Sequence, residues 1–172
     1  MLKRKIEDTL VQWKNTAGHK PLVIMGIRQC GKTFIAQHFA ANNYKTVVYI
    51  NFIKQPERIS AFVGSKAVDD ILLNLSSQIK DVTFTPGQTC FIFDEIQDCP
   101  EARTSLKFFK EDGRFDVIAT GSLLGVQGYG DEKKKKHRKL VSQKEPGINS
   151  VPVGSEDIIE MYPLDFEEFL WA

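Results

Sequence analysis

The sequence has no long apolar run, few cysteines and no leader-like start. No segment approaches the ~18 consecutive apolar residues of a membrane span. The first residues, Met-Leu-Lys-Arg-Lys, are basic and lead into no apolar stretch, so no secretory signal peptide is expected. The three cysteines, Cys30, Cys90 and Cys99, have no metal-ligand or disulfide spacing, which favours reduced thiols. We therefore expect a cytoplasmic protein that contacts no membrane.

Composition points to one folded domain with an uneven charge distribution. The 172 residues are 42% hydrophobic and 26% charged, which argues against disorder of the whole chain. The net charge of +1 conceals a basic segment, because residues 131–144 hold seven Lys or Arg against two acids. By contrast, Glu156 to Glu168 contains six carboxylates and no Lys or Arg.

Apolar runs alternate with helical patterns along most of the chain. Near-continuous apolar strands are typical of a parallel sheet that is covered on both faces. The predicted strands are 22–26, 45–52, 89–93 and 115–120, with one or two more in 151–162. The predicted helices are 4–17, 32–41, two pieces within 56–80, 100–110 and a last helix capped by Asp165, with Glu168 three residues on. Residues 125–150 lose the pattern, and we expect a flexible basic loop or insertion there.

The segment from Gly26 to Thr33 reads G-x-x-x-x-G-K-T, the pattern of a phosphate-binding P-loop. Glycine at both ends permits backbone conformations that a Cβ forbids, so that successive N–H groups can point at the phosphates. The following helix would offer its positive end to the same anion. Lys32 is expected at the β- and γ-phosphates and Thr33 on Mg²⁺. The other expected nucleotide contacts are Ile27, Arg28, Gln29, Cys30, Gly31 and Phe34.

A second motif follows about 70 residues later, where an apolar strand ends in Asp94-Glu95. A carboxylate at the end of a buried strand beside the loop strand can hold Mg²⁺ through its water shell, and Asp94 is our candidate. Glu95 points the other way and could polarise the water that attacks the γ-phosphate. A complete strand–helix unit lies between the motifs, and no N-K-x-D guanine motif occurs. Together these features predict an α/β, three-layer P-loop NTPase of the ATPase type, with a mainly parallel sheet of about five strands and helices on both faces.

Two further positions have weaker signals. Thr120 or Ser122, near Gly121, could place a hydroxyl between the γ-phosphate and the water, although a plain turn is an equal alternative. Asn51, which closes the second strand, could hydrogen-bond Glu95 and hold it off the water. A simple strand-end role is at least as good an explanation.

Four segments together resemble a known family: GIRQCGKT, FIFDEIQ, IATGSLL and YPLDFEEFL. They are similar to the predicted AAA-type ATPases of bacteria and archaea, from about Ile6 to the end of the chain. The resemblance implies nucleotide contacts by Arg28, Gln29 and Cys30, an Asp94–Gln97 motif, and a role for Ser122. In that family a further domain of unknown function usually follows, so we expect residues 1–172 to be the N-terminal ATPase core of a longer protein.

The resemblance leaves the basic segment and the arginine supply unexplained. The run Lys133–Lys139 is not part of the family pattern. Arg103 and Arg114 are available as arginine fingers, but solvated surface positions are the better interpretation of both. A C-terminal domain or a protein partner could supply the arginine instead, and turnover in isolation is then expected to be slow.

Two main functions remain open, with a third of a different class. The first is Mg²⁺-dependent ATP binding and hydrolysis, with Lys32, Glu95 and Ser122 as catalytic residues and Thr33 and Asp94 as metal ligands. The second is a nucleotide-dependent switch with little hydrolysis of its own. The third is nucleic-acid binding by Lys133–Lys139, which is not favoured because no aromatic residue is interleaved to stack on bases.

Overall fold

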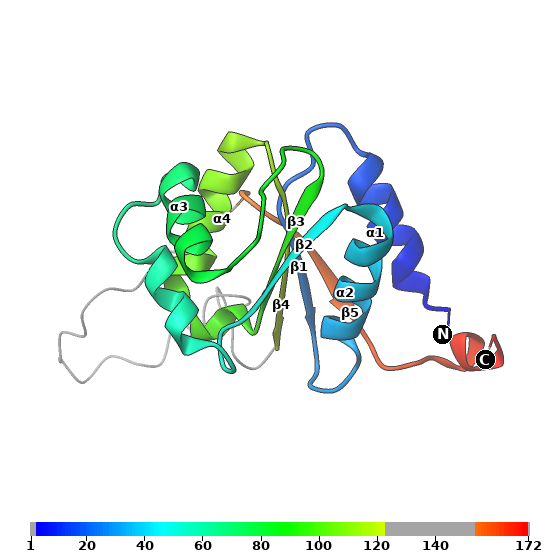
Figure 1. Cartoon of the computed structure of the whole chain (residues 1–172). Helices are drawn as coiled ribbons and strands as arrows, with labels where there is room; N and C mark the ends of the chain where they lie inside the picture. Colours follow the sequence, from blue (N-terminus) through cyan, green and yellow to red (C-terminus); the bar gives the residue numbers. More distant parts are fainter. Residues whose placement is uncertain (1–2, 123–153, 172) are drawn as a thin grey trace, which may run out of the picture.

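The computed structural model describes residues 3–122 and 154–171 (Figure 1). The strands are β1 (Leu22–Gly26), β2 (Thr46–Asn51), β3 (Thr89–Asp94), β4 (Asp116–Ser122) and β5 (Asp157–Met161). The helices are α1 (Lys5–Asn15), α2 (Lys32–Asn43), α3 (Val68–Gln78), α4 (Pro100–Asp112) and α5 (Phe166–Leu170), with 3-10 turns η1 (Pro56–Phe62) and η2 (Ile96–Asp98).

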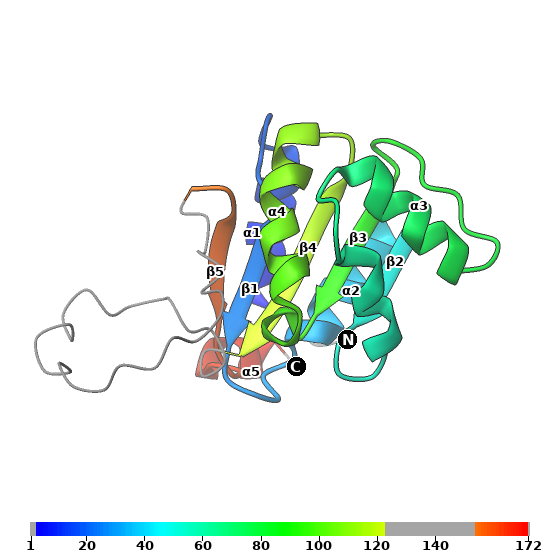
Figure 2. The ribbon, with the colours of Figure 1, turned by 90° about the vertical axis from the view of Figure 1, so that its left-hand side faces the viewer.

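The five strands form one sheet in the order β2-β3-β4-β1-β5 (Figure 2). Every neighbouring pair runs parallel. The predicted α/β fold class with a parallel sheet of about five strands is confirmed. Because all strands run the same way, their carboxyl ends lie at one edge of the sheet, where open α/β sheets bind ligands.

One detail of the predicted arrangement is wrong. The acidic strand β3 does not lie beside the loop strand β1, because β4 hydrogen-bonds to both and separates them. After β3 the chain forms α4, which packs on one face of the sheet, and then enters β4 between β3 and β1. As a result the end of β4, with Ser122, reaches the space between the loop and Asp94.

Helices cover both faces of the sheet and bury a core on each (Figure 1). On one face η1, α3 and α4 pack on a cluster rich in phenylalanine, in which the rings of Phe62 and Phe93 lie 5.2 Å apart. On the other face α1 and α2 cover residues such as Ile24 and Ile92. Strands β1 and β3 are buried along their full length, as their continuous apolar sequences predict.

The first and last described segments lie side by side, close to the carboxyl edge of the sheet (Figure 1). Helix α5 begins with the predicted capping box, in which Asp165 accepts from the N–H of Glu168 and the Glu168 side chain accepts from the N–H of Asp165. The packing of this box against α1 could not be read from the sequence. It brings the two ends of the described chain next to the loop after β1.

Candidate functional site

The loop from Gly26 to Thr33 joins the end of β1 to the start of α2 and admits little side-chain bulk. A Cβ on Gly26 would lie 2.3 Å from the carbonyl oxygen of Met161 on the neighbouring strand, so glycine is required there. Gly31 has φ +98° and Gln29 has φ +64°, both in the left-handed region. Residues Ile27, Arg28 and Gln29 are exposed, whereas Cys30 is buried.

Lys32 folds back into this loop and is only 8% exposed. Its ammonium donates to the carbonyl oxygens of Gly26 at 3.0 Å and Ile27 at 2.7 Å. Within residues 3–122 and 154–171, no carboxylate pairs with this ammonium. A buried charge without a counter-ion is costly, so an anion bound in the loop would be strongly favoured there.

The carboxylate of Asp94, at the end of β3, accepts hydrogen bonds from three other elements. Thr33 on α2 donates at 2.8 Å, Tyr49 and Asn51 on β2 each donate at 2.7 Å, and Thr120 on β4 donates as well. Burial alone would raise the pKa of Asp94, but these four donors outweigh it and hold the pKa below its usual value. The group is therefore an anion at neutral pH, with the Thr33 hydroxyl beside it.

Glu95 follows directly but has a different environment. Its φ of +55° lies in the left-handed region, which costs a non-glycine residue about 1–2 kcal/mol. Such strain gathers at functional sites. The Glu95 carboxylate accepts a hydrogen bond of 2.6 Å from the side-chain amide of Gln97, which also donates to Asp98 at 2.8 Å.

The prediction that Asn51 hydrogen-bonds Glu95 is wrong. Asn51 donates to Asp94 instead, because the two residues are register partners in the parallel β2–β3 pair. Glu95 lies beyond the strand end, where its left-handed backbone leads the chain away. The side chain that contacts Glu95 is Gln97, two residues along the same turn.

The remaining predicted positions differ in how they are held. Ser122 is buried at the end of β4, in register with Gly26 on β1. Thr120 is also buried, and its hydroxyl donates to the Asp94 carboxylate. Phe34, after the loop, is 60% exposed. The structure thus brings Lys32, Thr33, Asp94 and Ser122 to one edge, around the ends of β1, β3 and β4.

Comparison with known proteins identifies the family of this fold. Residues 18–170 match the family model described as an AAA domain. The chain belongs to this family and is an AAA-type P-loop ATPase core. The solved structure of C. elegans PCH-2 is similar at 11% identity and a TM-score of 0.49, over 95% of this chain and 43% of that one. No curated protein matched.

Neither candidate arginine finger bonds to a residue of the loop Gly26–Thr33. Arg103 is buried on α4 and pairs with Glu156 at 2.5 Å, so the expected solvated position is wrong. Arg114 pairs with Asp112 and Asp69 just before β4 begins. Glu156 directly precedes β5, so both guanidinium groups are paired with carboxylates outside the loop.

Some predictions for the AAA domain lie outside the described residues. These are the basic run Lys133–Lys139 and the insertion at 125–150. Among the described residues, no helix has the length and apolar character that crossing a membrane requires. Cys30, Cys90 and Cys99 are all free and buried.

Tyr49 is a site residue that the sequence analysis did not identify. It lies within β2, where an aromatic residue is usually interpreted as contributing to the packing of the sheet. Burial and its hydrogen bond to Asp94 raise the pKa of Tyr49 to about 12, so its hydroxyl keeps its proton and remains a donor. The signal available in the sequence was its position two residues before Asn51 on the same face of the strand.

Replacing Tyr49 with Phe should raise the pKa of Asp94, because one of four donors to the carboxylate is lost. The carboxyl carbon resonance of Asp94, followed by NMR against pH, reports the midpoint. Tyr44→Phe is the control, since Tyr44 donates to Asp116 instead. An Asp94 midpoint equal in Tyr49→Phe and the unaltered protein would contradict this account of the carboxylate.

Proposed function

We propose that this AAA domain, residues 1–172, binds Mg·ATP in the loop Gly26–Thr33 and hydrolyses it. The observation that carries the proposal is the buried ammonium of Lys32, whose contacts are backbone carbonyls and the Cys30 sulfur. A site that holds a cation this way within a glycine-bounded loop is suited to a phosphate chain. On binding, Lys32 would exchange the carbonyl oxygens for the β- and γ-phosphates.

The proposed metal ligands also fit their role chemically. Mg²⁺ prefers oxygen donors, and the Thr33 hydroxyl lies 2.8 Å from an ionised Asp94 carboxylate. Thr33 would bind the ion directly and Asp94 through its water shell. When bound, Mg²⁺ would neutralise the negative charge that develops on the phosphates. The donors on Asp94 from β2 and β4 would keep the carboxylate ionised and fixed in direction.

Glu95 is the proposed general base. It leaves the strand in a strained conformation next to Asp94, and a carboxylate there could accept a proton from water that attacks the γ-phosphate. Ser122, at the end of β4 opposite Gly26, would lie on the γ-phosphate side of the loop. The hydrogen bond from Gln97 occupies one oxygen of Glu95 and would restrain it until the amide moves.

A nucleotide-dependent switch with little hydrolysis is the second candidate. It is favoured by the Gln97–Glu95 hydrogen bond and by the pairing of Arg103 and Arg114 with carboxylates outside the loop. An arginine supplied by a partner or a further domain would then complete the site, which is worth roughly 10³–10⁵ in rate.

Contact of Lys133–Lys139 with nucleic acid stays a prediction, to be checked by oligonucleotide binding before and after neutralising that run.

Two substitutions test the proposed roles. Lys32→Ala should abolish binding of fluorescently labelled ATP with Mg²⁺, because the cation in the loop is lost. Glu95→Gln should keep binding but lower phosphate release by about 10²–10⁴-fold, the usual contribution of a general base. Equal turnover in Glu95→Gln and the unaltered protein would refute the assignment of the base.

Gln97→Met separates the two candidate functions while keeping side-chain length. If the amide restrains Glu95, its loss should raise basal phosphate release and leave ATP binding unchanged. Gln55→Met serves as the control, because Gln55 lies on the β2 side of the site and bonds the N–H of Asn51. Release that stays flat or falls in Gln97→Met would count against the restraint.

A further inference from the structure

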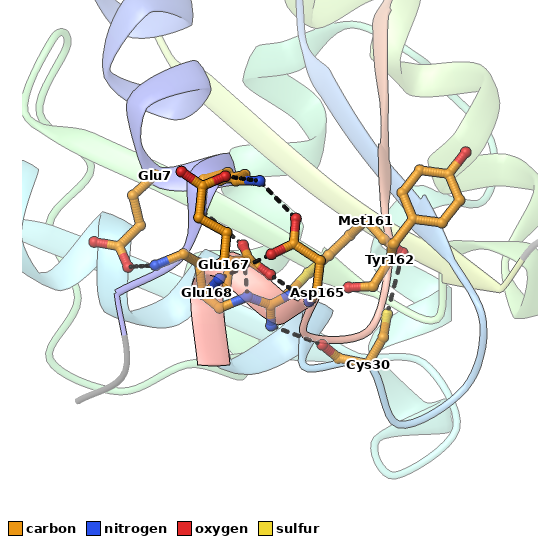
Figure 3. A network of polar contacts seen from close by, with 9 residues as sticks. Glu7, Cys30, Met161, Tyr162, Asp165, Glu167 and Glu168 are labelled. Atoms are coloured by element: carbon orange, nitrogen blue, oxygen red, sulfur yellow. Dashed lines mark hydrogen bonds and ion pairs between the residues drawn. The ribbon is translucent and has the colours of Figure 1, made fainter. Parts of the chain in front are cut away.

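Arg4, just before α1, joins three parts of the chain that are far apart in sequence. Its guanidinium donates to the carbonyl oxygen of Cys30 in the loop at 3.3 Å and to that of Tyr162 at 2.7 Å. Its third bond, of 3.1 Å, is to the Glu168 carboxylate on α5. Figure 3 shows Cys30, Tyr162 and Glu168 gathered around this network. The Arg4 and Glu168 side chains are only 13% and 6% exposed, so solvent screens their ion pair weakly.

The bond to Cys30 fixes the direction of a peptide in the loop. In a trans peptide the carbonyl oxygen and the following N–H point in opposite directions, and the described residues contain no cis peptide. With the Cys30 carbonyl directed at Arg4, the N–H of Gly31 points away from Arg4. Gly31 has φ +98°, and glycine allows its neighbouring peptides to turn at little cost, so a restraint on this peptide matters.

Glu168 ties the same guanidinium to α5. Its carboxylate also accepts from the backbone N–H of Lys5 at 2.8 Å and closes the capping box of α5 at the N–H of Asp165. One carboxylate therefore holds the start of α1 and the start of α5 together. Cys30 has a second tether, because its thiol donates to the carbonyl oxygen of Met161 at 3.4 Å.

We propose that Arg4 is a positioning residue for the nucleotide loop and couples the loop to α5. It holds the Cys30 peptide so that the Gly31 N–H faces the phosphates. Through its bond to Glu168, it also makes the position of α5 depend on the conformation of the loop. The inference rests on the proposed binding of ATP in this loop. Because coupling between sites is reciprocal, ATP in the loop should stabilise α5, and a stably placed α5 should tighten ATP binding.

Lys5 provides a matched control. Its side chain contacts Asp165 and Glu167 around the start of α5, each at 2.6 Å, but makes no contact with the loop. Arg4→Ala removes the contacts with both the loop and α5, whereas Lys5→Ala weakens only the attachment of α5. Arg4→Lys keeps the charge but loses the fork that reaches three acceptors at once.

The experiment measures binding of fluorescently labelled ATP with Mg²⁺, steady-state ATP turnover, and hydrogen exchange at residues 166–170 with and without ATP. We expect Arg4→Ala to raise Kd and KM about tenfold and to leave kcat within about twofold. Arg4→Lys should restore part of the loss, and Lys5→Ala should change Kd less than about twofold. ATP should slow exchange in α5 of the unaltered protein and of Lys5→Ala, but not of Arg4→Ala.

Each contrary result has a distinct meaning. An unchanged Kd in Arg4→Ala, or equal losses in Arg4→Ala and Lys5→Ala, would overturn the positioning role. ATP-dependent slowing at 166–170 that persists without Arg4 would overturn the coupling. Failure of the unaltered protein to bind Mg·ATP would instead refute the proposed function, and this inference with it.

Discussion

The carboxylate of Asp94 holds the carboxyl edge of the sheet together. It accepts hydrogen bonds from α2, β2 and β4 while belonging to β3, so four elements converge on two oxygen atoms. A buried anion is tolerated only when donors compensate for lost water, and here they more than do so. The position of Thr33, and with it the start of α2 and the end of the loop, depends on this compensation.

The loop has the opposite charge and the opposite requirement. Lys32 is buried among carbonyl oxygens, whereas Asp94 is buried among hydrogen-bond donors. Thr33, the residue after Lys32, connects them because its hydroxyl donates to Asp94. The Lys32 ammonium has no paired carboxylate within the described residues, and the Asp94 carboxylate is fixed by its donors. A phosphate chain would neutralise the first group, and Mg²⁺ would be attracted to the second. Both charges lie at the edge where the strands end, so in the proposed complex the parallel sheet would supply the geometry and the two side chains the affinity.

The sequence predicted local features better than distant contacts. The loop, the Asp94-Glu95 strand end and the capping box of Asp165 and Glu168 were found because each is a short pattern with a physical meaning. The order of strands was not, since nothing local says that β4 separates β1 from β3. The partner of Asn51 was mistaken for the same reason, because register decides it. Arg4 and Glu168 are 164 residues apart, and only the fold brings them into contact.

A crystal structure with Mg²⁺ and a non-hydrolysable ATP analogue tests the central claim most directly. The account predicts that the ammonium of Lys32 leaves the carbonyl oxygens of Gly26 and Ile27 and binds the β- and γ-phosphates. It also predicts a metal ion at about 2.1 Å from the Thr33 hydroxyl oxygen, with Asp94 bonded to its water shell. A nucleotide bound away from Gly26–Thr33, or phosphates in the loop with Lys32 still on the carbonyl oxygens, would contradict it.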